Sequence, residues 1–320
     1  MAEPEGADMS QTPDFSIITP VYNAAATIVE TIKTVQNQTS NNWEMIIIDD
    51  GSTDNSGAII RQVARSDPRI QLYQQDNRGP SAARNHGLRY ARGKYLAFLD
   101  GDDKWASERL TGMAEAFCLY PTAGVLFSRT RFIDATSGSP GTLTRHYPEL
   151  TLATLLAENP VCSTSNIVCR ASIMDRLGGF RSELKFAEDQ DWLVRVALDG
   201  SWAIRGIDAE WFYYRSSLAS QSTDLDALRR GWLDILARAA DIDNSLIMAL
   251  RQRAYGPYHR QLARRALRLH RPTLALKYLT DALVNDPGLI IRQPKRTGFT
   301  LLMALVSLLP SQTLKRSLAR

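Results

Sequence analysis

Residues 43–56 read WEMIIIDDGSTDNS, and this stretch decides the fold class. The run of three isoleucines at 46–48 is typical of a strand that is covered on both faces, as in a parallel sheet. Asp49 and Asp50 come directly after that strand, and residues 52–54 are of the types that cap helices. The stretch therefore predicts a buried strand, an acidic turn and a helix start.

The same order of strand and helix continues on both sides of this stretch. Residues 15–19 predict a buried strand that Pro20 ends, and Asn23 is expected to cap the helix that follows. Further along, residues 70–73 predict a strand, 79–91 a helix and 95–99 a fourth strand. Such alternation indicates an α/β fold with a doubly wound, mostly parallel sheet, in which ligands bind beyond the carboxyl ends of the strands.

Beyond residue 110 the sequence predicts shorter strands and more loop. Residues 124–127 and 167–169 favour strands, whereas residues 136–148 favour a turn-rich loop. Residues 186–198 favour a helix that has Trp192 on its apolar face.

The last third of the chain is predicted to be largely helical. We expect a helical hairpin over 258–286, a basic linker over 288–298 and an amphipathic helix over 299–320 that is interrupted at Pro310. The residues expected inside the hairpin are Ala266, Leu267, Leu274, Ala275, Tyr278 and Leu279.

Composition describes an ordinary globular protein. The chain has 320 residues, of which 44% are hydrophobic and 22% charged, enough for one large domain or two smaller ones. Its three cysteines lack CxxC spacing, which argues against a disulfide framework or a structural zinc site and favours a reducing, cytoplasmic compartment. Residues 1–13 are polar and are not expected to be a secretory signal, and no apolar run is long enough to span a membrane.

Positive charge is concentrated near the C-terminus. The net charge of the chain is +4, yet from residue 251 onward the only acidic residues are Asp281 and Asp286. A basic tail of this kind indicates an anionic surface as a partner, either membrane or nucleic acid; the alternative is a solvated helical face.

The acidic stretch Asp100-Gly101-Asp102-Asp103 follows the fourth predicted strand. Adjacent carboxylates repel one another unless a cation or hydrogen bonds compensate. Oxygen ligands at this spacing suit Mg²⁺ or Mn²⁺, which also bind phosphate. The alternative is a polar turn that caps the next helix, with Asp103 as its first residue.

Four other motifs contain residues suited to a nucleotide site. Tyr22 can stack on a base, Asp50 can accept from a base edge or a ribose hydroxyl, and Arg84, near a helix N-terminus, can bind a phosphate. Glu188 and Asp189 begin a helix, and one of them can act as a general base. Each also has a structural interpretation: a surface aromatic, a helix cap, an ion pair with an aspartate, and acids that the helix dipole favours.

Together these motifs resemble the large inverting glycosyltransferase family 2, which has the GT-A fold. The matching text is FSIITPVYNAAATIVETIKTVQNQT, WEMIIIDDGSTDNS, DNRGPSAARNHGL and GKYLAFLDGDDKWASERL, and further on NPVCSTSNIVCRASIMDRLGGF and FAEDQDWLVRVALDG. The resemblance implies a GT-A-type α/β fold, with a twisted sheet flanked by helices, a Rossmann-like nucleotide-binding half and a helical C-terminal extension.

The resemblance divides the chain into parts. It implies a nucleotide-sugar-binding half over 14–110 and an acceptor half over 111–222, so that the transferase domain is 14–222. Residues 1–13, which precede the match, are expected to be a disordered lead-in. It leaves residues 223–290 as a helical extension and 291–320 as a basic amphipathic helix.

The resemblance also implies the residues of a donor site. Tyr22 would stack on the base, Pro20 would line its pocket and Asp50 would bind the base edge, usually of uracil. Asp102 would ligate Mn²⁺ or Mg²⁺ at the diphosphate, with Asp100 as the second acid of the metal-binding pair, nearer the ribose. Arg84 would lie close to the diphosphate.

The implied reaction is a single displacement with one base. Asp189 would deprotonate the acceptor hydroxyl, Glu188 would shape the acceptor site and Trp192 would support its wall. Many relatives have a Tyr-Arg-x-His stretch after the base, whereas this chain has Ser217 at the histidine position and retains Arg215 and Ser220. In those relatives the histidine can help to bind the metal or the diphosphate, so the resemblance implies weaker metal binding in this chain.

The resemblance predicts an enzyme that transfers sugar from a nucleotide-diphospho-sugar, usually UDP-linked, to a glycan or lipid-linked acceptor of the cell surface. The alternatives are a nucleotide-sugar-binding protein without turnover and a nucleotidyltransferase, although the latter normally has a Gly-rich phosphate loop after strand one that this chain lacks. Residues 295–320 suit an anionic membrane, on the inner face of the plasma membrane, or a helix packed on the protein itself. No nucleic-acid partner is expected, because the tail lacks interleaved aromatics and a recognisable module.

Overall fold

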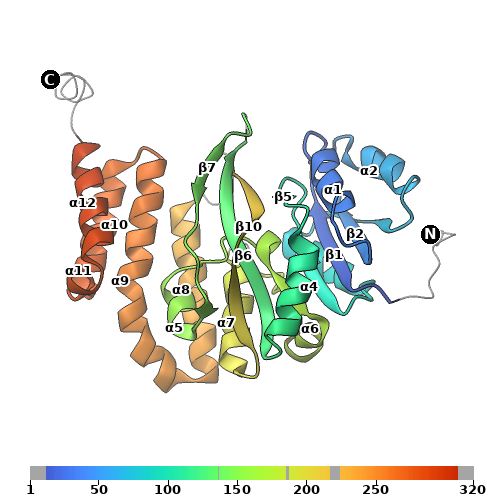
Figure 1. Ribbon diagram of the computed structural model, residues 1–320. Coiled ribbons are helices and arrows are strands. Elements are labelled where there is room, and N and C mark those ends of the chain that lie inside the picture. The colour runs from blue at the N-terminus through green and yellow to red at the C-terminus, as the bar shows by residue number, and fades with distance from the viewer. Residues whose placement is uncertain (1–11, 136, 185–186, 217–223, 309–320) are drawn as a thin grey trace. The chain divides into compact units, whose positions relative to one another are not determined.

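The computed structural model describes residues 12–135, 137–184, 187–216 and 224–308. The chain divides into two compact units (Figure 1). The sheet unit comprises Met1–Thr151 with Pro160–Ser217, and the helical unit comprises Leu152–Asn159 with Leu218–Arg320. Each unit is described by itself below.

The first half of the sheet unit is a parallel sheet, as the sequence predicts. Its strands lie in the order β3-β2-β1-β4, and all pairings among them are parallel. They are β1 (Phe15–Val21), β2 (Trp43–Asp50), β3 (Ile70–Gln75) and β4 (Tyr95–Phe98), connected through α1 (Ile28–Gln36), α2 (Ser56–Ala64) and α3 (Pro80–Leu88).

The two faces of β2 are both buried, which explains its uninterrupted apolar run. Met45 and Ile47 pack in the same cluster as Ile32 of α1, whereas Ile46 and Ile48 pack against Ala83 of α3. Successive side chains of a strand point to opposite faces, so a strand between two helical layers needs apolar residues at every position.

The second half of the sheet unit mixes parallel and antiparallel pairings. Strand β9 is antiparallel to both β4 and β6, β6 is parallel to β10, and β5 is antiparallel to β10. These strands are β5 (Lys104–Trp105), β6 (Ala123–Asp134), β9 (Val168–Arg170) and β10 (Ala203–Ser216), accompanied by α4 (Arg109–Leu119), α6 (Ala171–Leu177), α7 (Glu188–Asp199) and the 3₁₀ turn η1 (Thr164–Asn166).

Three local predictions in this unit are wrong. Asn23 does not cap α1; it has a φ of 52° and lies in the preceding loop. The predicted loop over 136–148 contains β7 (Pro140–Leu143), which pairs with β6, and a second short strand, β8 (Glu149–Leu150), pairs with β10. Asp103 does not begin a helix, because α4 starts only at Arg109.

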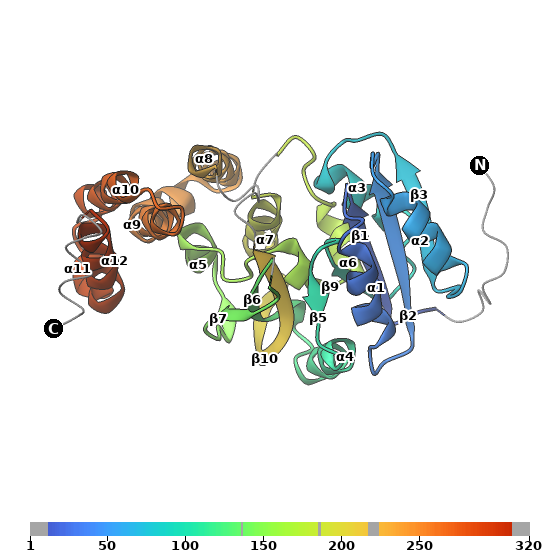
Figure 2. The same ribbon diagram turned by 90° about the horizontal axis from the view of Figure 1, so that it is seen from above.

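The helical unit contains α5 (Leu152–Ala157), α8 (Leu225–Ile242), α9 (Asn244–Arg268), α10 (Pro272–Asn285), α11 (Leu289–Arg292) and α12 (Pro294–Val306). Figure 1 shows α9, α10 and α12 side by side, and Figure 2 views them close to end-on. The predicted hairpin is confirmed: Ala266, Ala275, Tyr278 and Leu279 are buried, while Leu267 and Leu274 are half-buried.

The predicted linker over 288–298 is wrong, because α11 and the first turn of α12 occupy it. The predicted helix over 299–320 is present as far as Val306, and Pro310 lies outside the described residues. Within the part of the chain that the structure describes, no helix is long and apolar enough to cross a bilayer.

Candidate functional site

The candidate site lies along one edge of the parallel sheet. Strands β1, β2 and β4 run in the same direction, so their carboxyl ends, at Val21, Asp50 and Phe98, share that edge. The sequence placed Asp49 and Asp50 directly after the second strand. In the structure they are the last two residues of β2. The edge where parallel strands end is the usual ligand-binding position of such sheets.

Pro20 and Tyr22 differ sharply in exposure. Pro20 is buried within β1, opposite Ile48 of β2, whereas the side chain of Tyr22 is 51% exposed just beyond the strand. An exposed aromatic ring at this edge is available to stack on a planar ligand.

The loop after β1 is fastened to the loop after β2. The main-chain nitrogen of Asn23 donates to Ser52 Oγ at 3.0 Å, and Asn23 Oδ1 accepts from the main-chain nitrogen of Thr53 at 2.8 Å. Asp54 accepts from the main-chain nitrogens of Ala25 and Ser56. The Gly-Ser-Thr-Asp stretch therefore fixes both loops, beyond the helix-capping role that its sequence suggests.

Asp50 is engaged by the start of α3. Its carboxylate accepts from the main-chain nitrogens of Arg78 and Gly79 at 2.9 and 2.8 Å, and from Gln75 Nε2 at 2.7 Å. Gly51 has a φ of 73°, and a Cβ there would lie 2.9 Å from the nitrogen of Asn77, so this turn needs glycine. Asp50 thus orients the β3–α3 turn as well as reaching the sheet edge.

Arg84 of α3 joins the two acidic motifs. One terminal nitrogen of its guanidinium lies 2.6 Å from Asp100 Oδ1, and the other lies 2.9 Å from Glu188 Oε1. Arg84 is only 2% exposed; burial lowers its pKa, but the charges of Asp100 and Glu188 outweigh this and leave the pKa above its usual value. The structural alternative, an ion pair with an aspartate, is therefore the arrangement that Arg84 adopts.

The stretch Asp100–Asp103, called the acidic segment below, concentrates negative charge. Desolvation by the surrounding protein, together with the charge of Asp100, raises the pKa of Asp102 to about 6, even though its side chain retains contact with solvent. Burial and the charges of Asp102 and Asp100 raise the pKa of Asp103 well above its usual range. Asp103 Oδ1 accepts from the main-chain nitrogen of Arg215, whereas its buried Oδ2 has no hydrogen-bond partner among the residues that the structure describes.

These acids fit a divalent cation that is shared with a substrate. Among the residues that the structure describes, no group of three or more His, Cys, Asp or Glu side chains is placed to hold a metal. Mg²⁺ and ions like it are commonly held by one or two carboxylates and completed by the phosphates of the substrate. Asp102 and Asp100 would supply such carboxylates, and a cation would offset the repulsion that raises the pKa of Asp102.

Glu188 and Asp189 begin α7, whose preceding residue Ala187 has a φ of 60°. Burial and the neighbouring charge of Asp189 raise the pKa of Glu188, and Arg84 lowers it. Asp189 is largely buried, and its Oδ1 accepts from the main-chain nitrogen of Gln190 at 2.7 Å. Since Arg84 contacts both Glu188 and Asp100, the first turn of α7 lies beside the acidic segment.

The remaining residues of the α7 motif have structural partners. Asp191 is buried and pairs with Arg181 and Arg195 at 2.7 and 3.1 Å. Trp192 is fully buried, donates through Nε1 to the carbonyl of Gly178, and packs near Phe180, whose ring lies 5.7 Å below the Arg84 guanidinium. Trp192 therefore supports the site from behind.

Sequence reasoning missed several residues of the site. Ser165 Oγ accepts from the main-chain nitrogen of Asp100 at 2.9 Å, and Thr27, the N-cap residue of α1, and Thr31 of α1 donate to main-chain oxygens of the acidic segment. No local signal distinguishes these hydroxyls from ordinary loop and helix residues. Ser217 and Ser220 lie outside the described residues.

Relatives of known sequence match only part of the chain. TuaG of Bacillus subtilis (strain 168), whose name assigns it to teichuronic acid biosynthesis as a glycosyltransferase, is 43% identical over 117 residues, 35% of this chain and 46% of that protein. An uncharacterized glycosyltransferase of Haemophilus influenzae is 48% identical over 99 residues, 31% of this chain and 40% of that protein. These matches span less than half of either relative.

Solved structures resemble the chain over most of its length. S. aureus TarS 1–349 in complex with UDP-GlcNAc has a TM-score of 0.58 at 21% identity, covering 88% of this chain and 92% of that one. The mannosyltransferase PcManGT of Pyrobaculum calidifontis, in complex with GDP-Man and Mn²⁺, has a TM-score of 0.60 at 20% identity, covering 93% and 87%. At this identity the likeness establishes the GT-A fold.

The family assignment rests on the sequence of the sheet unit. The model of the family described as glycosyl transferase family 2 matches residues 16–178, which include all but the first residue of β1, the acidic segment and the turn η1. This span is about half of the chain and contains every predicted donor-site residue. The chain belongs to glycosyl transferase family 2.

Proposed function

We propose that this protein is an inverting glycosyltransferase that moves a sugar from a nucleotide-diphospho-sugar to a hydroxyl acceptor. The observation that carries the proposal is the Arg84 bridge, since it joins Asp100 of the acidic segment to Glu188, the neighbour of Asp189. A donor held at the acidic segment would therefore lie beside the proposed base. Membership of the family supports the same reaction.

The proposed donor site uses the ends of three strands. Tyr22 stacks on the base, Pro20 lines the pocket from within β1, and Asp50 binds the base edge. Asp100 lies towards the ribose, and Asp102 towards the diphosphate. Bound Mn²⁺ or Mg²⁺, held by Asp102 with Asp100, would neutralise charge on the departing diphosphate.

Arg84 has a different proposed role from the one that the sequence suggested. It is buried, and both of its terminal nitrogens already contact carboxylates. We propose that it orients Asp100 and Glu188 and does not touch the diphosphate.

The reaction is a single displacement at the anomeric carbon. The acceptor hydroxyl gives its proton to the carboxylate of Asp189, and the acceptor oxygen forms a bond to the anomeric carbon as the bond from that carbon to the diphosphate oxygen breaks. Attack from the face opposite the leaving group converts an α-linked donor into a β-linked product. Glu188, held by Arg84, shapes the acceptor side of this site.

The proposed donor is UDP-linked, and the proposed acceptor belongs to a cell-surface glycan or glycolipid. The bound UDP-GlcNAc of TarS and the teichuronic acid assignment in the name of TuaG support this choice. The three cysteines are all free, which suits the reducing cytoplasmic side of the membrane where such donors would be used. We further propose peripheral attachment to an anionic membrane through residues 295–320.

Calorimetry with UDP- and GDP-sugars in the presence of Mn²⁺ tests the proposal. In a sugar-transfer assay, Asp189→Asn should lower kcat by about 10²- to 10⁴-fold, the usual contribution of a general base. In calorimetry the same variant should keep its donor affinity within about threefold of the wild type. Asp175→Asn, an exposed aspartate on α6, is the matched control and should change neither quantity.

Two results would contradict the proposal. Absence of nucleotide-sugar binding across the panel would exclude the enzyme. Binding without transfer to any hydroxyl acceptor would favour a nucleotide-sugar-binding protein, and release of pyrophosphate from a nucleoside triphosphate would favour a nucleotidyltransferase.

A further inference from the structure

The acidic segment is held through its main chain. Three successive carbonyl oxygens, those of Gly101, Asp102 and Asp103, each accept a hydrogen bond from a side chain. Thr27 Oγ1 donates to the first at 2.9 Å, Arg215 Nε to the second at 2.8 Å, and Thr31 Oγ1 to the third at 2.9 Å. Main-chain oxygens held at consecutive residues leave the segment little freedom to rotate.

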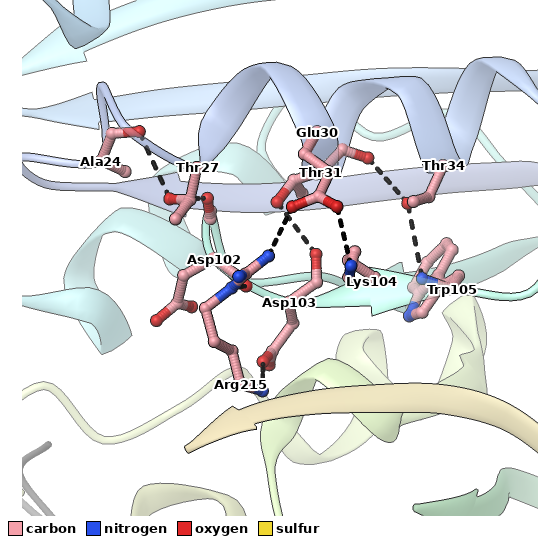
Figure 3. A network of polar contacts seen from close by, with 11 residues as sticks. Ala24, Thr27, Glu30, Thr31, Thr34, Asp102, Asp103, Lys104, Trp105 and Arg215 are labelled. Atoms are coloured by element: carbon pink, nitrogen blue, oxygen red, sulfur yellow. Dashed lines mark hydrogen bonds and ion pairs between the residues drawn. The ribbon is translucent and has the colours of Figure 1, made fainter. Parts of the chain in front are cut away.

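Two of these side chains come from one polar face formed by α1 and its N-cap residue, Thr27. Thr27, Glu30, Thr31 and Thr34 follow the spacing that places residues on one side of a helix, and Thr34 Oγ1 accepts from the main-chain nitrogen of Trp105 at 3.4 Å. Figure 3 shows this row above the segment that runs from Asp102 to Trp105. The opposite, apolar side of α1 packs into the core of the sheet unit.

Glu30 fixes the third side chain, Arg215. Its Oε2 lies 2.6 Å from a terminal nitrogen of Arg215, and its Oε1 lies 2.7 Å from Lys104 Nζ. Arg215 in turn contacts the segment twice, through Nε to the carbonyl of Asp102 and through its main-chain nitrogen to Asp103 Oδ1 (Figure 3). Glu30 therefore connects helix α1, strand β5 and the end of strand β10.

We propose that Glu30 is a positioning residue for the acidic segment: by holding Arg215 it sets the backbone from which Asp102 projects. This inference rests on the proposed function, in which Asp102 faces the metal and the diphosphate. Glu30 contacts none of the proposed reacting groups, so its substitution should change donor binding much more than the displacement step.

Glu30→Gln tests the inference, because it keeps the size of the side chain but removes its charge and one of its two acceptor oxygens. Loss of a partly exposed ion-pair network should weaken UDP binding in the presence of Mn²⁺ by about threefold to fivefold and leave kcat within about twofold. Without any ligand, amide hydrogen exchange should become faster over residues 101–104 and at Arg215. Glu115→Gln, an exposed glutamate on α4, is the matched control and should alter none of these measurements.

A double-mutant cycle shows whether Glu30 acts through Arg215. In an Arg215→Met background, Glu30→Gln should produce no further change in exchange or affinity. An undiminished effect in that background, or unchanged exchange and UDP affinity in Glu30→Gln alone, would overturn the inference. If the wild-type protein binds no nucleotide, the proposed function fails, while the exchange measurement still decides whether Glu30 positions the segment.

Discussion

At the residue scale, Arg84 is a buried cation whose charge is compensated by Asp100 and Glu188. Two ions removed from water are costly, and removing one partner of a buried pair leaves the other without compensation. Burial already raises the pKa of Glu188, which Arg84 opposes. The arginine thus favours the charged form of a carboxylate next to the proposed base, against the effect of burial.

We expect Arg84→Met to lower the free energy of unfolding by about 3–5 kcal/mol, measured by urea denaturation at pH 7, because it leaves Glu188 buried without its cation. The double variant Arg84→Met/Glu188→Gln should regain part of this loss, since it removes the uncompensated charge. Arg176→Met provides the control: Arg176 pairs with Asp199 at 2.8 Å on the surface, and its loss should leave the free energy of unfolding nearly unchanged. Equal losses in Arg84→Met and Arg176→Met would contradict a buried, mutually dependent site.

The sequence predicts which acids belong to the candidate site better than it predicts their partners. Asp50 ends a strand that the apolar pattern identifies, and Asp100 and Asp102 follow another, so their common edge could be inferred. Asp103 is different, because its burial and its contact with Arg215, 112 residues away, depend on the pairing of β5 with β10.

Arg109 was not predicted for a related reason. It is fully buried, and its guanidinium donates to Ser128 Oγ and to both oxygens of Asn166. Burial lowers its pKa to about 9, so it stays protonated at neutral pH. Its partners come from β6 and η1, and nothing near residue 109 in the sequence indicates them.

At the element scale, apolar periodicity predicted the strands and helices that are buried, and tertiary contacts decided the rest. Asn23 is of a residue type that caps helices, yet its side chain accepts a hydrogen bond from Thr53 of the neighbouring loop, and α1 starts five residues later. Strand β7 is exposed and contains proline and glycine, so only its pairing with β6 makes it a strand. The basic stretch over 288–298 became helical because α11 and α12 pack against α10.

Helix α9 contains a buried histidine, and we expect it to make the helical unit sensitive to acid. The ring of His259 stacks on Tyr255 with centroids 3.8 Å apart and meets Trp232 edge-on. Its Nδ1 donates to the carbonyl of Tyr255, and within the described part of the chain its Nε2 has no hydrogen-bond partner. Burial lowers the pKa of His259 from its ordinary value of 6.5; Arg229 also lowers it, while the Tyr255 carbonyl and Asp281 act in the opposite direction.

Because this pKa is lowered in the folded protein, the unfolded chain takes up the proton first as the pH falls. The stabilisation from neutral His259 should be complete above about pH 6.5 and decline below it. Thermal unfolding between pH 5 and 8 should show a steeper acid loss in the wild type than in His259→Phe, which keeps the ring stack. His86 also has a lowered pKa, so some acid sensitivity should remain in the variant. Identical pH profiles for the two proteins would refute this assignment, and His270→Asn, at an exposed histidine, should match the wild type.

At the scale of the whole molecule, the family match covers little of the helical unit, of which only Leu152–Asn159 lies within it. The matched residues end at 178, whereas α8 to α12 lie beyond residue 224. The donor site can therefore be predicted from the family, but the role of the helical unit cannot. That role has to be argued from its own surface.

Helix α12 has an unusual distribution of side chains. It packs within the helical unit through small residues, Thr297, Thr300 and Ala304, and leaves Phe299, Leu302 and Leu305 between 50% and 60% exposed. Large apolar side chains normally face the core of a soluble protein, and a contiguous exposed group of them indicates an interaction surface. From residue 288 to the C-terminus the sequence contains six basic residues and no acid, so an anionic bilayer is the partner that matches both charge and hydropathy.

We therefore expect the wild-type protein to float with vesicles of phosphatidylglycerol and phosphatidylcholine and to remain in solution with phosphatidylcholine alone. Phe299→Glu/Leu302→Glu should reduce flotation by about tenfold or more, because two charges replace apolar contacts with the acyl region. Leu119→Glu is the matched control, since Leu119 on α4 is also strongly exposed but lies in the sheet unit. Equal flotation of the α12 variant and the control would mean that this face does not contact lipid. Equal flotation of the wild-type protein with anionic and neutral vesicles would mean that lipid charge does not contribute to binding. A protein held by α12 would meet lipid-linked or surface-glycan acceptors at the membrane, which is where the proposed transfer requires them.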